Sequence, residues 1–411
     1  MIFSNNIHSI LHSYQQEMRV ELSSILQYWY QHTVDKKYGG FLGKVNNENI
    51  ADTEADKGVV LHARILWTFS AAYIITPDET HLQMADCAFQ YLVKYFIDDD
   101  YGGVYWSVDY KGKIKESRKQ IYGLAFVLYG VSEYYSATKN ESALVLAKDL
   151  FTAIEQYSLD KKNNGYYEAL SRDWQPINDL RLSAKDANAS KTMNTHLHII
   201  EAYANLYKVW RHETLKQKIQ NLLHLFDEYF ISKKTHHLIL FFDDEWNEQP
   251  DVISYGHDIE AAWLLLRCAE NIEDKQWISV FQNNAQTITG AASEGLDTDG
   301  GLWYEYEAGH NKLIKQKHWW PQAEAMIGFL NAYQLSGKEE HLEKSLNAWL
   351  FTQNYLLDKQ NGEWFWGVDE AYKIMPGEDK AGFWKCPYHN ARACMEVMKR
   401  IGDIKHAKQN Q

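Results

Sequence analysis

Three histidines stand out because each lies near the start of a segment with helical apolar spacing: His198, His257 and His389. Imidazole has a pKa near 6.5, so it takes up and returns a proton readily at neutral pH. A lone histidine at a helix start is usually a cap or a surface residue. Three of them at matching positions of a repeat instead predict one cavity that removes and returns a carbon-bound proton, as in a sugar isomerase or epimerase.

Charged, polar and aromatic residues accompany the histidines at these helix starts, and seven are candidate substrate-binding residues: Arg64, Tyr122, Asn194, Glu260, Trp320, Glu324 and Trp384. His257 and Glu260 are three residues apart, so on a helix Glu260 is expected to accept the imidazole N–H and raise its basicity. Trp319 and Trp320 are neighbours and cannot share a face, so at most one of them is expected to line the cavity.

Helix geometry also separates two histidines of the third segment. Asn194, His198 and Glu201 follow the spacing i, i+4, i+7 and therefore share one face. His196 lies two residues before His198 and points nearly the opposite way, so it is expected to pack or hydrogen-bond within the wall. His318 is expected to be structural.

The elements that must position these residues form an internal repeat. A turn with aromatic residues recurs six times, with spacings of 63, 63, 72, 63 and 62 residues, and five of the six copies contain glycine. The positions that define these spacings are Gly39, Gly102, Gly165, His237, Gly300 and Gly362. Such a constant period indicates one structural unit repeated along the chain.

Two stretches with helical apolar spacing follow each of the first five turns. With a helix near 7–33 and one near 386–402, they predict twelve helices, at roughly 57–76, 80–97, 118–137, 141–158, 191–210, 213–231, 257–271, 275–290, 318–336 and 340–357. A pair of helices cannot bury its apolar face alone, so the units must stack. We therefore predict an all-α fold, an (α/α)6 toroid with short β-hairpins between units, in a single domain over residues 1–411.

Closure of the ring would place the first turns of all the inner helices at one rim. Helix N-termini offer unpaired N–H groups and a partial positive charge, which favour an oxygen-rich ligand. The third unit is longer than the others, and its extra residues, around Pro176–Ser190, are expected to form a loop over that rim.

Composition narrows the class of protein. The 411 residues are 45% hydrophobic and 24% charged, values typical of globular proteins, so a large core is expected. The net charge of −13 argues against a nucleic-acid partner or an anionic membrane surface, because both favour a basic face. Aromatic residues reach 14%, including 15 Trp, which suits stacking on sugars or bases.

Targeting and crosslinking signals are sparse. Four cysteines form no CxxC pair and no disulfide scaffold. The first residues lack a basic n-region and a continuous apolar core, and no apolar stretch reaches about 18 residues, so neither a signal peptide nor a membrane span is expected. We expect a cytoplasmic enzyme that is a monomer or a weak homo-oligomer.

Metal, nucleotide and acyl-transfer chemistry receive little support. His196 and His198 have the spacing of ligands on a strand, whereas a helix presents metal ligands at i, i+4. Asp98–Asp100 lacks the later ligands of a calcium loop and is expected to be a solvated turn. No glycine-rich nucleotide loop and no GxSxG motif occurs, so no metal or nucleotide is expected.

Four segments carry a resemblance to a known family. Residues 191–203 contain the string Met-Asn-Thr-His-Leu-His, and residues 255–260, 317–324 and 384–390 contain the other histidines and tryptophans. They closely resemble the corresponding segments of cellobiose 2-epimerases, which belong to the N-acylglucosamine 2-epimerase superfamily of (α/α)6 barrels. The resemblance extends over essentially the full chain. Its most specific part is the string at 193–198, where the other epimerases and isomerases of the superfamily differ.

The resemblance implies an enzyme without a cofactor that epimerises 4-linked disaccharides at C2 of the reducing-end glucose. Cellobiose, lactose and 4-linked mannosyl-glucose would be its partner sugars. His257 and His389 would be the acid/base pair flanking C2, in an order that stays open, and His198 would assist ring opening and the enediolate. The residues implied in holding or stacking on the sugar are Arg64, Tyr122, Asn194, Trp320 and Trp384.

Three alternatives remain open at this point. One is a monosaccharide aldose–ketose isomerase or an N-acylglucosamine 2-epimerase of the same superfamily. The second is a glycoside hydrolase, since Asp258, Glu260 and Glu324 offer the carboxylates that hydrolysis needs. The third is a sugar-binding protein without catalysis, although a binder needs no set of three acid/base histidines. The preferred disaccharide and any side isomerisation to a 2-ketose are not predicted.

Overall fold

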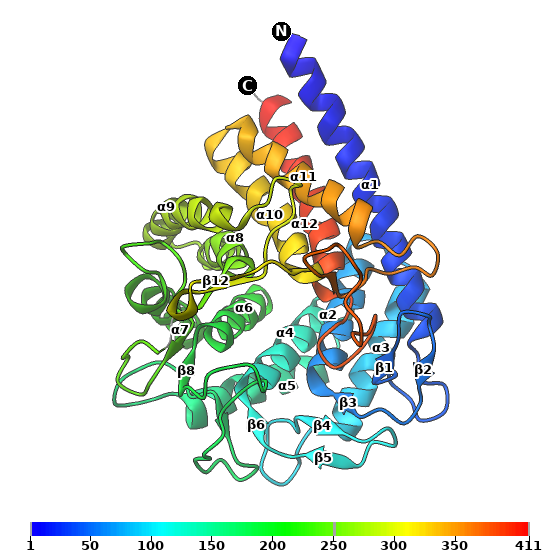
Figure 1. The fold of residues 1–411 in the computed structure, drawn as a ribbon. Coiled ribbons are helices and arrows are strands. Elements are labelled where there is room, and N and C mark those ends of the chain that lie inside the picture. The colour runs from blue at the N-terminus through cyan, green and yellow to red at the C-terminus, as the bar shows by residue number, and fades with distance from the viewer. Residues whose placement is uncertain (1, 250–251, 410–411) are drawn as a thin grey trace.

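The helices alternate along the chain between an inner and an outer ring (Figure 1). The computed structural model describes residues 2–249 and 252–409, which form twelve α-helices and fourteen short strands. The inner helices are α2 (Val59–Ile75), α4 (Ile121–Thr138), α6 (Met193–Val209), α8 (Tyr255–Asn271), α10 (Trp319–Ser336) and α12 (Tyr388–Gln409). The outer helices are α1 (Ile2–His32), α3 (Glu79–Tyr95), α5 (Glu141–Ala153), α7 (Glu213–Leu225), α9 (Lys275–Ala292) and α11 (Glu339–Tyr355).

The inner helices close into a ring because they are apolar on nearly all sides. In α4, every residue from Ile121 to Ser132 is buried, whereas α3 and α7 bury only one stripe. Each inner helix packs against the next, from α2 through α4, α6, α8 and α10 to α12, and α12 packs against α2. The fold is therefore the predicted (α/α)6 barrel, with helix bounds within seven residues of those expected. Helices α5 and α7 end earlier than expected because each continues as a short π-helix, Ile154–Ser158 and Phe226–Phe230. Among the helices described, none is both long and apolar enough to cross a membrane.

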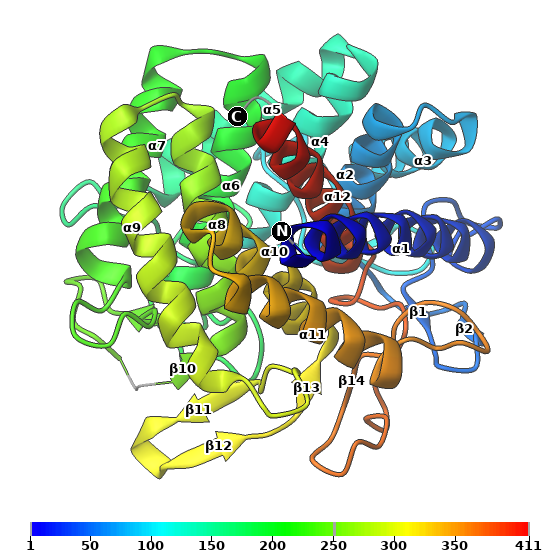
Figure 2. The same cartoon turned by 90° about the horizontal axis from the view of Figure 1, so that it is seen from above.

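Short strands join neighbouring units at one end of the barrel, along the lower part of Figure 2. The strand that precedes an inner helix pairs with the hairpin of the next unit, as in β3–β4, β6–β7, β8–β9, β10–β11 and β13–β14. A bridge between Val45 and Ala381 joins the first unit to the last. The strands are β1 (Lys44–Val45), β2 (Ala51–Asp52), β3 (Lys57–Gly58), β4 (Ser107–Val108), β5 (Ile114–Glu116), β6 (Lys119–Gln120), β7 (Ala169–Leu170), β8 (Lys191–Thr192), β9 (Phe241–Phe242), β10 (Val252–Ser254), β11 (Glu305–Glu307), β12 (Lys312–Ile314), β13 (Lys317–His318) and β14 (Gly367–Val368).

One backbone requirement explains the repeated turns. Each turn is closed by a β-bridge, from Val34–Phe41 in the first unit to Leu357–Trp364 in the last. Every turn has a residue with positive φ, between 63° and 86°, at an equivalent position, a conformation that favours glycine. These residues are Gly39, Gly102, Asn164, His236, Gly300 and Gly362, and in four turns the next residue has a positive φ as well. The bridges Leu159–Tyr166 and Ile231–Leu238 place the equivalent position of the third and fourth units one residue earlier than the sequence pattern indicated.

A buried ion pair fastens five of the six turns to the start of an inner helix. The lysines are buried, and each Nζ lies 2.8 Å or less from its carboxylate. The pairs are Lys57–Asp35, Lys119–Asp98, Lys191–Asp160, Lys317–Asp297 and Lys380–Asp358. In the fourth unit, Ser232 stands at the aspartate position, and His237 bonds Asp258 of α8 instead.

We expect the Lys191–Asp160 pair to stabilise the fold strongly. Lys191→Met leaves the Asp160 carboxylate buried without its cation, so the free energy of unfolding should fall by about 3 kcal/mol. Denaturant unfolding measures the change, and Asp160→Asn added to Lys191→Met should restore part of it. Lys162→Met is the matched control, because the Lys162–Glu245 pair of the same unit is exposed and 4.0 Å long. Equal losses in Lys191→Met and Lys162→Met would contradict the prediction.

Candidate active site

The first turns of the inner helices surround a cavity of about 510 Å³ at the end of the barrel that carries the strands. Its wall residues follow a register, since the second and sixth residues of a helix share a face. The second residues are Tyr122, Asn194, Trp320 and His389, and the sixth residues are Arg64, His198 and Glu260. His257, the third residue of α8, and Trp384, just before α12, also line the cavity.

Nine of the ten site residues expected from the sequence therefore meet at one cavity. The exception is Glu324, which is fully buried behind His389 and does not reach the cavity surface. His196 is in the wall, as expected: its Nδ1 lies 2.7 Å from the Thr192 carbonyl, and its Nε2 accepts the Tyr166 N–H at 2.9 Å. His318 stacks on Tyr304, also away from the cavity.

Each of the three histidines has its Nδ1 engaged within the wall. Nδ1 of His198 lies 2.9 Å from Glu201 Oε2, and Nδ1 of His389 lies 2.7 Å from Glu324 Oε1. Nδ1 of His257 lies 2.8 Å from the Ser254 hydroxyl. Nε2 is then the nitrogen that each ring can offer to a ligand.

The expected bond between His257 and Glu260 is not the one formed. Ser254, the residue just before α8, binds the imidazole, and the Glu260 carboxylate accepts a hydrogen bond from Arg392 at 2.6 Å. The i, i+3 spacing permitted the contact, but a guanidinium attracts a buried carboxylate more strongly than a neutral ring does.

Burial determines the charge of two of the histidines. It lowers the pKa of His257 to about 4, and it holds the pKa of His389 well below its usual range. Both rings are therefore neutral at neutral pH and suited to act as bases. Burial alone would raise the pKa of Glu201, but Arg392 and the bond with His198 outweigh it and lower that pKa to about 2.

Arg392 lies at the centre of a buried cluster that the sequence did not reveal. Its Nη1 donates to Glu201 Oε1 at 2.6 Å, and its Nη2 donates to Oε1 of both Glu260 and Glu324 at 2.6 Å. The partners come from α6, α8 and α10, far away in the chain, so no local spacing indicates them.

This cluster bears on the possibility of a metal site. Glu260, Glu324 and His389 offer donor atoms within 4.8 Å of one another. The Arg392 guanidinium already contacts both carboxylates, and His389 bonds Glu324. The donors are thus paired with a cation of the protein itself and do not fit an additional divalent ion.

Polar groups of two kinds lie in the cavity wall: a hydrogen-bonded pair, and atoms that have no hydrogen-bond partner in the part of the chain that the structure describes. Arg64 Nη2 donates to the Tyr122 hydroxyl at 2.7 Å, which holds both groups at the wall. Within the described residues, Asn194 Oδ1 and the indole nitrogens of Trp319 and Trp366 are buried without a hydrogen-bond partner. Trp319 and Trp320 both line the cavity, so the expectation that at most one does is wrong.

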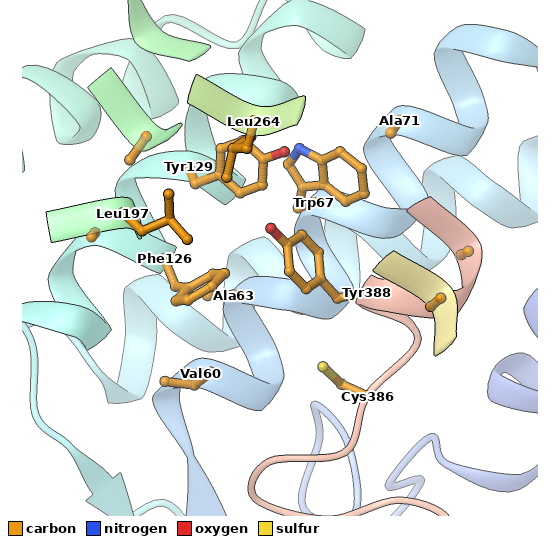
Figure 3. Close-up of a cluster of buried hydrophobic side chains, with 14 of the residues drawn as sticks. Val60, Ala63, Trp67, Ala71, Phe126, Tyr129, Leu197, Leu264, Cys386 and Tyr388 are labelled. Atoms are coloured by element: carbon orange, nitrogen blue, oxygen red, sulfur yellow. The ribbon is translucent and has the colours of Figure 1, made fainter. Parts of the chain in front are cut away.

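A loop lines the cavity, and an aromatic cluster packs against two of its histidines. Residues 181–187 of the long third-unit loop line it, as the extra length predicted. In this aromatic cluster, Trp67 of α2, Phe126 of α4 and Tyr388 of α12 converge (Figure 3), with the Trp67 and Tyr388 rings 5.4 Å apart. Phe126 packs on His198, with ring centroids 4.5 Å apart. Lining residues that the sequence did not indicate include Glu168, Phe241, Tyr304, Glu305 and Trp366.

Known proteins share both the sequence and the fold. The sequence model of the N-acylglucosamine 2-epimerase (GlcNAc 2-epimerase) family matches residues 39–393. The cellobiose 2-epimerase of Bacteroides fragilis is 46% identical over 385 residues, which cover 93% of this chain and 98% of that protein. A cellobiose 2-epimerase of Ruminococcus albus is 39% identical, over 94% of this chain and 99% of that protein. The solved structure of cellobiose 2-epimerase from Spirochaeta thermophila is 35% identical, with a TM-score of 0.91, over 96% of this chain and 98% of that one.

We expect the Glu260–Glu324–His389 group to take up no divalent ion. Protein incubated with Zn²⁺ or Mn²⁺ and then desalted should carry no more metal than a His389→Gln variant, because Arg392 already neutralises the carboxylates. Elemental analysis measures the content, and EDTA should leave the melting temperature unchanged. One equivalent of metal that is present in the wild type and lost in His389→Gln would contradict this prediction.

Proposed function

The chain belongs to the N-acylglucosamine 2-epimerase family, and we propose that it inverts C2 of the reducing-end glucose in 4-linked disaccharides, converting cellobiose to glucosyl-mannose. The observation that carries the proposal is the meeting of three imidazoles at one cavity, each with Nδ1 held in the wall. The names of the relatives at 46% and 39% identity supply the substrate class. We propose that the whole chain acts as one catalytic domain.

The first step must open the sugar ring, because the C2 proton is acidic only beside a free carbonyl. His198 donates a proton from Nε2 to the ring oxygen and keeps the Nδ1 proton that binds Glu201. The proton of the C1 hydroxyl passes to a neutral imidazole of the pair His257 and His389. That imidazole becomes the acid for a later step.

In the second step, the C2 proton is removed from one face of the sugar and another proton is added to the opposite face. The other imidazole of the pair removes the C2 proton with Nε2, and the electron pair of the C–H bond forms the enediolate. The charged imidazole then returns its proton to C2 from the opposite face. Closure of the ring returns the ring-oxygen proton to His198, and O1 takes the proton that the base removed. Both rings lie beside Trp320, with ring centroids at 4.7 Å for His257 and 5.7 Å for His389.

The remaining wall residues hold and orient the sugar. Arg64 and Tyr122 form one hydrogen-bonded unit, and Asn194 Oδ1 is free to accept from a sugar hydroxyl. Trp320 and Trp384 are half-buried and line the cavity, which suits stacking on the apolar faces of the sugar rings.

The carboxylates weaken the hydrolase alternative. Glu260 and Glu324 are held by Arg392, and Glu324 does not reach the cavity. Asp258 bonds His237 and the Leu238 N–H in the wall. No pair of these three flanks a bond in the cavity, so epimerisation is favoured over hydrolysis.

The proposed function is tested by incubating purified protein with cellobiose in D2O and identifying the product. We expect glucosyl-mannose with deuterium at C2 of the reducing sugar and at no other carbon, because the returning proton has exchanged with solvent. Nuclear magnetic resonance and mass spectrometry measure the label. Released glucose would indicate hydrolysis, conversion of mannose or glucose alone would indicate a monosaccharide isomerase, and an unlabelled C2 would exclude imidazole as the base.

Substitution should separate the catalytic histidines from the structural one. His257→Ala and His389→Ala should lower kcat by about 10²–10⁴-fold, the usual contribution of a positioned acid or base. His196→Ala is the control, because it leaves the Tyr166 N–H without its acceptor and should cost about 1–3 kcal/mol of stability. Steady-state kinetics and thermal unfolding measure the two effects. Loss of turnover in folded His196→Ala with full turnover in His257→Ala would reverse the assignment.

Activity should persist into acid. His257 must be neutral to act as a base, and its pKa is lowered to about 4, so kcat/KM should fall only as the pH drops toward 4. The profile of kcat/KM against pH measures this, provided that circular dichroism shows a folded protein at each pH. An acid limb near 6.5, the value of a free imidazole, would contradict the prediction.

A further inference from the structure

We propose that Arg392 is a positioning residue for the epimerisation: it clamps the carboxylates that orient His198 and His389, so that both rings present Nε2 to the sugar. The proposal rests on the proposed function and adds to it the residue that holds two of the histidines in place through their carboxylate partners. Arg392 does not line the substrate cavity and therefore acts through other residues. It borders a separate cavity of about 980 Å³, which Trp67 of the aromatic cluster also lines.

Two carboxylates connect the guanidinium to the histidines. Glu201 accepts from Arg392 through Oε1 and from His198 through Oε2, so it bridges the two groups. Oε1 of Glu324 accepts from both Arg392 and His389. Displacement of the guanidinium would therefore release the acceptors that hold both imidazoles in the wall.

The acceptors fix the orientation of these rings, because a carboxylate at Nδ1 accepts the Nδ1 proton and leaves Nε2 for the substrate. Arg392 and the bond with His198 lower the pKa of the buried Glu201 carboxyl to about 2. At Glu324, burial outweighs Arg392 and raises the pKa of the carboxyl, so His389 is held there by the geometry of the hydrogen bond. The charged and titratable groups that face the guanidinium are Tyr129 of α4, Glu201 of α6, Glu260 of α8, Glu324 of α10 and Tyr388 of α12.

The position of Arg392 is itself fixed by aromatic packing. Its guanidinium lies 4.3 Å from the centre of the Tyr388 ring and 5.0 Å from that of Trp263. The Tyr388 hydroxyl donates to Glu201, and the Trp263 indole N–H donates to Glu324 at 3.0 Å. The same aromatic residues thus hold the guanidinium and the carboxylates in one arrangement. A lysine has no planar fork and would reach only part of this set.

The chain contains a matched control on the same helix. Arg400 is also buried on α12 and lies over Trp263, with 5.6 Å to the ring centre. Its Nη1 donates to the amide oxygens of Asn331 and Gln334, and it contacts none of the carboxylates that bind the catalytic histidines. Arg400→Lys therefore reports the general cost of losing a buried arginine from α12.

The first experiment compares Arg392→Lys, Arg392→Met and Arg400→Lys with wild type in cellobiose epimerisation. Arg392→Lys should lower kcat by about 10–100-fold, as expected for the loss of a group that orients a catalytic one, while KM changes by less than about threefold. In Arg392→Met the acid limb of kcat/KM should also move up by about one pH unit, because the carboxylates lose their cation. Arg400→Lys should keep the wild-type kcat and pH profile.

Either of two kinetic results would overturn the proposal. An equal loss of kcat in folded Arg400→Lys and folded Arg392→Lys would show that the loss is the general cost of replacing a buried arginine of α12. Wild-type kcat in folded Arg392→Lys would show that the clamp is not required. If Arg392→Met fails to fold, Arg392→Lys retains the charge and still tests the geometry.

The second experiment needs neither turnover nor an arginine substitution. Long-range ¹H–¹⁵N spectra of wild-type protein with labelled histidine should show His198 and His389 protonated at Nδ1, with His198→Gln and His389→Gln used for assignment. Protonation of either neutral ring at Nε2 alone would overturn the proposal. A wild-type protein with the expected spectra but no conversion of cellobiose would refute the proposed function and leave the clamp standing.

Discussion

The packing of four inner helices at the centre of the barrel depends on one guanidinium, that of Arg392. Arg392 of α12 binds carboxylates from α6, α8 and α10, and all of these groups are buried. Buried carboxylates are costly to desolvate, and only a cation with good geometry offsets that cost. The barrel must therefore close with all four helices in register before the cluster is stable. The requirement that stabilises the centre of the ring also places the groups that hold His198 and His389.

Much of the fold was predictable because it depends on local physics repeated six times. A turn residue with positive φ, an apolar stretch and a returning helix leave their marks in the sequence, as at Gly39 or Gly362. The register of the site was also accessible, since residues such as Asn194 and His198 share a face through helix geometry alone. Regular spacing therefore indicated both the barrel and most of the cavity wall.

The parts that could not be predicted involve partners far apart in the chain. The contact of Arg392 with Glu201 joins positions 191 residues apart, and no spacing rule selects it. The same reason explains why Glu260 was expected to bind His257. The i, i+3 spacing describes neighbours on one helix only, whereas Arg392 of another helix binds Glu260 and Ser254 binds His257. Glu324 was expected to line the cavity, but its bonds with Arg392, His389 and Trp263 keep it behind the wall.

The order of helices along the chain has a consequence for synthesis on the ribosome. Among the described helices, α12 follows all the other inner helices along the chain, and it carries both Arg392 and His389 and joins α10 back to α2. Until it emerges, the earlier units form an open arc in which Glu201, Glu260 and Glu324 lack their shared cation. Unpaired carboxylates in that arc favour hydration over burial, so the nascent chain is kept from collapsing prematurely around an incomplete centre. The residues proposed to transfer protons are thus brought together only when α12 has joined the ring.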